Sequence, residues 1–174
     1  DSEEGASAMM NELGFYTLAG QPKSPRDLID EVRTGEALGL GSAFISERFN
    51  VKEAATLSGA VGAVSTRLGI ATAATNHNTR HPMVTAAYAM TMHRLTDGRF
   101  SLGLGRGIAP MFKAYGLPKV TTAQLEDFVG ILRRLFRGET VFAHDGPAGR
   151  YPLLSLGPDY AGEIPLVLKV NNSD

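Results

Sequence analysis

The chain contains no cysteine, so disulfide bridges and thiolate chemistry are excluded. It also lacks an excess of either charge: 17 Lys and Arg stand against 18 Asp and Glu, for a formal net charge of −1. Nucleic-acid binding therefore has no basic excess to support it. No apolar run approaches the roughly 18 residues of a membrane-spanning helix. These absences predict a cytoplasmic protein that binds neither nucleic acid nor membrane.

The 174 residues are 43% hydrophobic and 20% charged, which suits one globular domain of ordinary size. The chain begins with small and polar residues that lack the apolar core of a signal peptide. We therefore expect residues 1–10 to be a disordered or non-native start, and residues 11–174 to form the domain.

Short apolar runs alternate with helical patterns along the chain. Strands are expected at 13–18, 42–45, 68–74, 99–105 and 164–170. Helices are expected from Ser24 as cap to a stop at Gly39, at 54–64, at 82–95, and over 125–136 behind a Thr121 capping box. A hairpin is expected within 140–156, around an Asp-Gly-Pro turn.

This alternation predicts an α/β fold with a parallel sheet and right-handed crossovers. Two architectures fit: an open doubly wound sheet, or part of a (β/α)8 barrel. A whole barrel takes about 250 residues, and this chain holds only five strands of the eight. The last strand is apolar, and no later segment covers it. An exposed apolar strand with an unpaired edge would be prone to aggregation. The barrel reading therefore predicts either a homo-oligomer or a missing C-terminal half.

Polar or glycine-rich segments follow three of the expected strands. They are residues 46–50, which include Glu47 and Arg48, residues 75–81, and residues 103–107. In parallel α/β folds the carboxyl ends of the strands carry function, so these segments should meet at one face. Glu47 and Arg48 there can bind a planar polar heterocycle or a substrate anion. The plainer alternative is a surface ion pair.

The loop after the third strand contains two histidines, His77 and His81, four residues apart. On a helix this spacing would suggest a metal pair, but Pro82 and the preceding strand indicate a loop, and no third ligand stands nearby. We expect no metal. His81 fits as the cap of the following helix, and His77 as an acid or hydrogen-bond donor near a reacting group. The glycines 103, 105 and 107 fit a phosphate turn, a close backbone approach to a flat ligand, or simple turn chemistry.

Three segments together resemble the bacterial luciferase-like family, in its F-420-dependent oxidoreductase branch. They are FISERF at 44–49, TNHNTRHP at 75–82 and LTDGRFSLGLGRG at 95–107. The resemblance implies a (β/α)8 barrel of which about the first five strands are present. It also implies that coenzyme F-420, or alternatively FMN, binds at the carboxyl end of the barrel.

The resemblance further implies a set of site residues. A non-proline cis peptide is expected at the end of the third strand, at Ala73–Ala74, behind the cofactor ring. Glu47 and His77 would be catalytic. The cofactor-binding residues would be Glu47, Arg48, Ala73, Ala74, Thr75, Asn76, Gly105, Arg106 and Gly107, and Thr75, Asn76 and His77 would face the cofactor.

Three functions remain open at this point. The first is hydride transfer between F-420 and an organic small-molecule substrate, with His77 as proton donor, since the cofactor carries the chemistry. The second is an FMN-dependent monooxygenase of the same fold. The third is an inactive half-barrel that acts as a binding or assembly module. Some F-420-dependent dehydrogenases carry a catalytic Glu just after the glycines of the fourth strand. Ile108 stands there instead, which argues against their sugar-phosphate chemistry.

Overall fold

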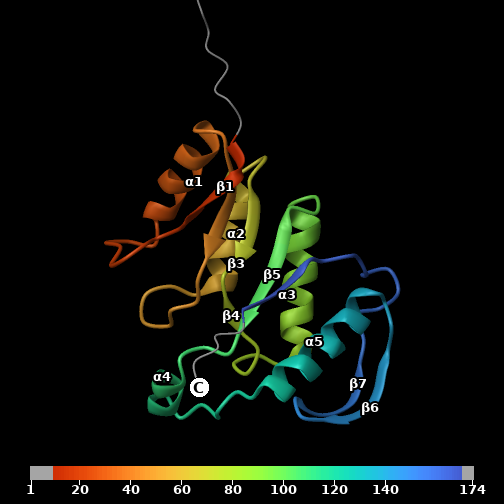
Figure 1. Cartoon of the computed structure of the whole chain (residues 1–174). Helices are drawn as coiled ribbons and strands as arrows, with labels where there is room; N and C mark the ends of the chain where they lie inside the picture. The colour runs from red at the N-terminus through yellow and green to blue at the C-terminus, as the bar shows by residue number, and fades with distance from the viewer. Residues whose placement is uncertain (1–9, 170–174) are drawn as a thin grey trace, which may run out of the picture.

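Parallel strands form a single curved sheet in the computed structural model, which describes residues 10–169 (Figure 1). The expected disordered start lies almost wholly outside these residues. The sheet strands are β1 (Met10–Tyr16), β2 (Leu40–Ile45), β3 (Gly69–Thr72), β4 (Thr75–Asn76), β5 (Phe100–Gly105) and β8 (Leu166–Lys169). The helices are α1 (Asp27–Ala37), α2 (Ala54–Val64), α3 (Pro82–Leu95), α4 (Ala109–Ala114) and α5 (Thr122–Phe136). An antiparallel hairpin, β6 (Val141–Gly146) and β7 (Gly149–Leu154), lies outside the sheet.

The order of elements in space is that of a barrel segment. The sheet runs β1-β2-β3-β5, the short β4 continues β3 along β5, and β8 pairs in parallel with β5. Helices α1, α2, α3 and α5 contact one another in chain order. A doubly wound sheet would place helices on both of its faces. The five barrel strands and the hairpin predicted from the sequence are therefore confirmed.

Local sequence signals set the helix boundaries. Thr121 Oγ1 accepts from the Gln124 backbone N–H at 3.1 Å, and Gln124 Oε1 accepts from the Thr121 N–H at 2.9 Å, which is the predicted capping box. His81 Nδ1 accepts from the Met83 N–H at 3.2 Å and so caps α3, as predicted. The prediction for Ser24 is wrong: α1 begins at Asp27, and the Ser24 hydroxyl accepts from the N–H of Arg26 in the preceding turn.

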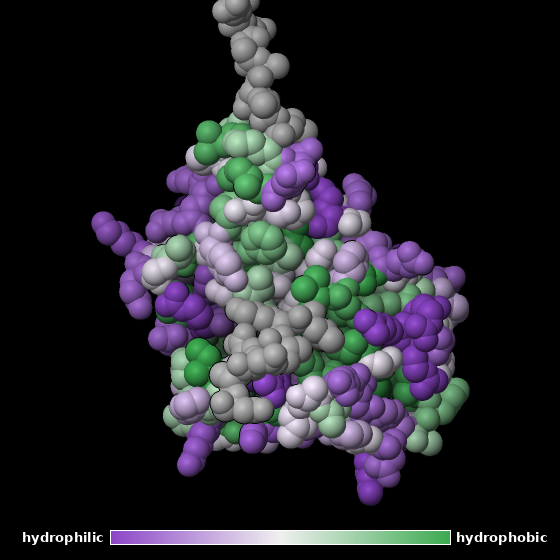
Figure 2. Space-filling model, viewed as in Figure 1, coloured by the Kyte–Doolittle hydropathy of each residue, from purple (hydrophilic) through white to green (hydrophobic). Residues whose placement is uncertain are grey.

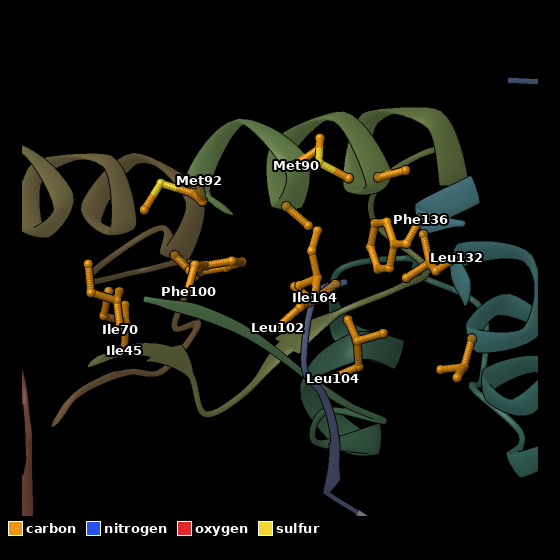
Figure 3. Close-up of a cluster of buried hydrophobic side chains, with 14 of the residues drawn as sticks. Ile45, Ile70, Met90, Met92, Phe100, Leu102, Leu104, Leu132, Phe136 and Ile164 are labelled. Carbon is orange, nitrogen blue, oxygen red and sulfur yellow. The ribbon is translucent and has the colours of Figure 1, made fainter. Parts of the chain in front are cut away.

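The hydrophobic core fills the space between the sheet and the helices (Figure 3). Side chains of Phe100, Leu102 and Leu104 point from β5 toward Met90 of α3 and Leu132 of α5, and all five are fully buried. Burial of one such side chain contributes about 1.5–3 kcal/mol. The core therefore fixes the sheet, and with it the ends of the strands that lead into the site.

The other face of the sheet is only partly covered. Tyr16, Phe44, Ala71 and Ser101 are paired in register across four strands and form one row on this inner face. Phe44, Ala71 and Ser101 are half-buried and Tyr16 is 51% exposed. On the side seen in Figure 2, apolar surface gathers toward the middle, between hydrophilic side chains along the edges.

Three elements differ from the prediction. The first strand was expected at residues 13–18, whereas β1 spans Met10–Tyr16. The third strand was expected to run unbroken to residue 74, but β3 ends at Thr72, where the chain bends around β5. No helix was predicted between Gly107 and Thr121, where residues 109–114 form α4. No helix among residues 10–169 is long and apolar enough to cross a membrane.

Candidate functional site

A cavity of about 280 Å³ lies at the carboxyl ends of β2, β3 and β5. The three segments predicted to converge all contribute to it. Its lining consists of Ser46, Glu47, Arg48, Phe49, Ala73, Ala74, Asn76, Gly105, Arg106, Gly107, Ile108, Met111, Phe112 and Tyr115. Eight of the residues predicted for the site therefore lie around one cavity, whereas Thr75 and His77 do not line it.

The floor of this cavity is the peptide between Ala73 and Ala74, which is cis, as predicted. Hydrogen bonds from three segments hold it. The Tyr16 hydroxyl donates to the Ala73 carbonyl at 3.0 Å, and the Glu47 N–H donates to the Ala74 carbonyl at 3.1 Å. Next to it, Thr72 Oγ1 donates to the Gly103 carbonyl at 2.8 Å. The floor is thus fixed to β1, β2 and β5.

Glu47 lies at the edge of the cavity with a side chain only 1% exposed. One carboxylate oxygen accepts from the Ala54 N–H at 3.0 Å, and the other from Thr75 Oγ1 at 2.5 Å and the Arg80 guanidinium at 3.2 Å. Arg80 also pairs with Glu53, whose carboxylate accepts from two N–H groups at the start of α2. Both oxygens of Glu47 are therefore engaged, so this geometry favours an anchoring role over the predicted catalytic one.

Thr75 and His77 were predicted to face the cofactor, and their side chains point elsewhere. The cause is the two-residue period of an extended chain. Asn76 pairs with Gly105 and lines the cavity, so its two neighbours face the opposite side. The Thr75 hydroxyl reaches Glu47, and the His77 ring packs on Phe128 with the ring centroids 5.1 Å apart.

Asn76 presents a polar side chain to the cavity without a protein partner among residues 10–169. The residue is 6% exposed, and its side-chain amide forms no hydrogen bond with any other residue between 10 and 169. A buried amide normally has partners for its donor and acceptor groups. Its position therefore suits a ligand that offers both a donor and an acceptor.

Two guanidinium groups give the cavity a positive rim. Arg48 Nη1 donates to the Gly20 carbonyl at 2.8 Å, and Arg106 Nη1 contacts Thr122 Oγ1 at 3.4 Å. Lys52 lies behind Arg48 and was not singled out by the sequence reasoning. It is 5% exposed, and its ammonium donates to the carbonyls of Thr17 at 2.6 Å and Leu18 at 3.2 Å. Burial, together with Arg48, lowers the pKa of Lys52, which holds the end of β1 in place.

The apolar wall of the cavity was missed by the sequence reasoning. Phe49 stacks on Phe112 with ring centroids 6.3 Å apart and meets Tyr115 edge-on at 6.2 Å. Gly107 has φ +72°, and a Cβ there would lie 2.3 Å from the Phe112 ring, so only glycine lets α4 fold back. Two features of the sequence could have predicted α4: Pro110 in its first turn, and apolar residues at helical spacing after this proline.

Stability should fall as the pH drops below about 6.5, because of His77. Burial lowers the pKa of this imidazole from its ordinary value of 6.5, so the unfolded chain takes up the proton first. The melting temperature of His77→Phe should therefore depend less on pH between 7.5 and 5.5 than that of the wild type. An unchanged dependence of the melting temperature on pH would contradict this.

Glu36 and Glu53 affect stability at lower pH. Burial opposes the shift of both carboxyl groups, but backbone N–H donors lower both pKa values below the ordinary 4.5.

The chain is similar in sequence to known proteins. The Luciferase-like monooxygenase family matches residues 7–168, and the chain belongs to this family. A curated relative is the F-420-dependent glucose-6-phosphate dehydrogenase of Mycobacterium avium (strain 104). It is 31% identical over 145 residues, which cover 75% of this chain and 43% of the relative.

Solved structures share the fold. The coenzyme F-420-dependent tetrahydromethanopterin reductase of Methanopyrus kandleri superimposes with a TM-score of 0.74 at 18% identity, over 92% of this chain and 50% of its own. The oxygenating constituent of 3,6-diketocamphane monooxygenase from Pseudomonas putida, in complex with FMN, gives 0.72 at 20% identity, over 92% and 51%. The chain therefore spans about half the length of the proteins it matches, and the fold is about half of a luciferase-like barrel.

Proposed function

We propose that this chain forms the cofactor-ring half of an oxidoreductase that transfers hydride between coenzyme F-420 and an organic substrate. The observation that carries this proposal is Asn76, which is 6% exposed, lines the cavity beside Ala73 and Ala74, and has a side-chain amide without a hydrogen-bond partner among residues 10–169. Curated relatives whose names state F-420 dependence support it. This chain spans about half the length of the proteins it matches, so the activity is proposed for a whole protein that contains such a half.

The residues around the cavity fit such a cofactor. The cis peptide and the backbone of Gly105 and Gly107 form surfaces on which a flat ring can lie. The Asn76 amide would bind the polar edge of the ring, and Arg48 and Arg106 would hold its anionic tail. F-420, when bound, supplies the hydride-transfer chemistry. The chain's own contribution is to orient the ring and exclude water.

The wall formed by α4 and Phe49 would face the substrate. Ile108, Met111 and Tyr115 are 60%, 37% and 48% exposed beside the cavity. The carboxylate of Glu47 is already neutralised by Arg80. The three side chains of this wall carry no charge, so this side favours an uncharged organic substrate over a sugar phosphate. His77 as proton donor receives no support from its position, which is outside this cavity.

FMN is the alternative cofactor, because the FMN complex from Pseudomonas putida shares the fold over 92% of this chain. The proposal also includes a partner that completes the barrel, either a second copy or a C-terminal half. Among residues 10–169, β8 pairs only with β5, so its other edge is open to such a partner.

The Asn76→Ala variant should bind F-420 about tenfold more weakly than the wild-type chain, the loss of one or two hydrogen bonds. The measurement is a fluorescence titration of the 174-residue chain with F-420 and, separately, with FMN. Asn50→Ala is the matched control, because Asn50 is exposed and does not line the cavity.

Each outcome of these titrations decides between the three functions. Saturable F-420 binding that weakens in Asn76→Ala supports the proposal. Binding of FMN but not of F-420 would favour the alternative function, an FMN-dependent monooxygenase. Binding of neither cofactor by a chain that is folded and monomeric would favour the inactive half-barrel. If Asn50→Ala weakens F-420 binding as much as Asn76→Ala does, Asn76 is not a cofactor-binding residue.

A further inference from the structure

A second cavity, of about 190 Å³, lies on the other side of the loop that follows β4. It is enclosed by this loop, by the start of α5 and by the β6-β7 hairpin. None of its lining residues also lines the first cavity. Asn76 faces the first cavity, whereas His77 and Asn78 face the second.

Unpartnered polar atoms gather in this second cavity. His77 is 6% exposed, and its Nδ1 is buried without a hydrogen-bond partner. The side-chain oxygen and nitrogen of Asn78 are also buried and unpartnered. Leaving such a group unsatisfied costs about 1–3 kcal/mol, so native proteins seldom do so without a purpose. Three such atoms lie on two adjacent residues that line the cavity, so a molecule bound there would give them partners.

The other lining groups select the charge of that molecule. Lys119 lines the cavity and has no carboxylate partner among residues 10–169. Arg80 adds a second cation at its edge, although its charge is shared with two glutamates. Gln124 accepts from the Thr121 N–H through its oxygen, which leaves its NH2 group as a donor. Among the residues that the structure describes, no acidic side chain lines the cavity.

We propose that the second cavity binds a compact oxyanion, a carboxylate or a phosphate. His77, Asn78 and Gln124 would donate hydrogen bonds to it, and Lys119 would supply the opposite charge. The buried Phe128 and the partly buried Ala148 form the apolar side of the cavity. A volume of about 190 Å³ holds roughly six waters, and so it also holds a small anion with one or two waters.

The histidines make this proposal directly measurable. The chain has four of them, so the ring signals in a proton–carbon NMR spectrum are few. The chain is titrated with acetate and, separately, with inorganic phosphate, at constant pH and ionic strength. The His77 ring signals should shift saturably with at least one of the two anions. His93 is the internal control, because its Nδ1 is also buried and unpartnered but lies on α3, away from the cavity.

A variant separates specific binding from a general salt effect. Lys119→Ala changes an exposed residue, so the variant should fold. Its affinity for the anion should be about tenfold lower, the lower end of what one charge-assisted hydrogen bond contributes. Stronger binding of acetate would identify the site as one for carboxylates, and stronger binding of phosphate as one for phosphates. The proposal is overturned if His77 does not titrate with either anion, if His93 shifts in parallel, or if Lys119→Ala leaves the affinity unchanged. Its test does not depend on F-420 binding.

Discussion

Replacing Arg80 with methionine should lower the free energy of unfolding by about 3–5 kcal/mol, the usual cost of removing one partner of a buried ion pair. The carboxylate that it leaves behind belongs to Glu47, whose side chain is 1% exposed. Methionine keeps much of the volume of the arginine stem and removes its charge. Urea unfolding of the wild type and the variant measures the difference.

The reason for so large an effect is that Arg80 joins three segments of the site. Its guanidinium contacts Glu47 after β2, Glu53 at the start of α2, and Thr75 Oγ1 at 2.9 Å in β4. Without it, a charge stays in a place that water hardly reaches. The loop around Asn76 would loosen as well, so F-420 binding should weaken together with stability.

Arg150→Met is the matched control. Arg150 pairs with Asp145 on the hairpin, and their side chains are 83% and 65% exposed. Such a surface pair contributes about 0–1 kcal/mol. Adding Glu47→Gln to Arg80→Met removes the stranded charge and should restore part of the stability. Equal effects of the two arginine substitutions, or no rescue by the glutamine, would show that the buried pair does not anchor this site.

The second large effect is expected for Gly103→Ala, which should destabilise the fold by about 3 kcal/mol, at the upper end of what overpacking usually costs. A Cβ on Gly103 would lie 1.9 Å from the Thr72 carbonyl oxygen and 3.0 Å from its carbon. Both atoms belong to the backbone, so no side-chain rotation relieves the clash. Strands β3 and β5 must separate where the cis peptide begins.

Thermal unfolding of Gly103→Ala beside Gly130→Ala tests this explanation. Gly130 is exposed on α5, and a Cβ there meets nothing within 4 Å. Alanine favours a helix over glycine by about 0.5–1 kcal/mol, so this control should be slightly more stable than the wild type. If Gly103→Ala melts at the wild-type temperature, the close approach of β5 to β3 is not a constraint on this sheet.

Much of this architecture can be predicted from the sequence because the signals are local. The alternation of apolar runs and helical stripes predicts the order of the elements, and Thr121 with Gln124 marks the start of α5 to the residue. The convergence of three polar segments follows from the rule that parallel strands end at one edge. The cis bond at Ala73–Ala74 came from family resemblance, and no local propensity predicts it.

What could not be predicted depends on direction in space. Which of Thr75, Asn76 and His77 faces the cavity is decided by the pairing of β4 with β5, and a slip of one residue would reverse it. The engagement of Glu47 depends on Arg80, which is 33 residues away in the chain. The fold of α4 depends on Gly107 and Phe112 meeting across a tight turn, and such a contact has no periodic signature.

The attachment of α4 bears on how such a site changes during evolution. This helix stands outside the hydrogen-bonded ladder of the sheet (Figure 1) and is held by aromatic contacts with Phe49 and by the fit of Phe112 over Gly107. The floor of the cavity, by contrast, is tied to three strands. Mutations can therefore exchange the residues of one wall without disturbing strand register. A scaffold divided in this way lets selection diversify one wall of the cavity while its floor is inherited unchanged.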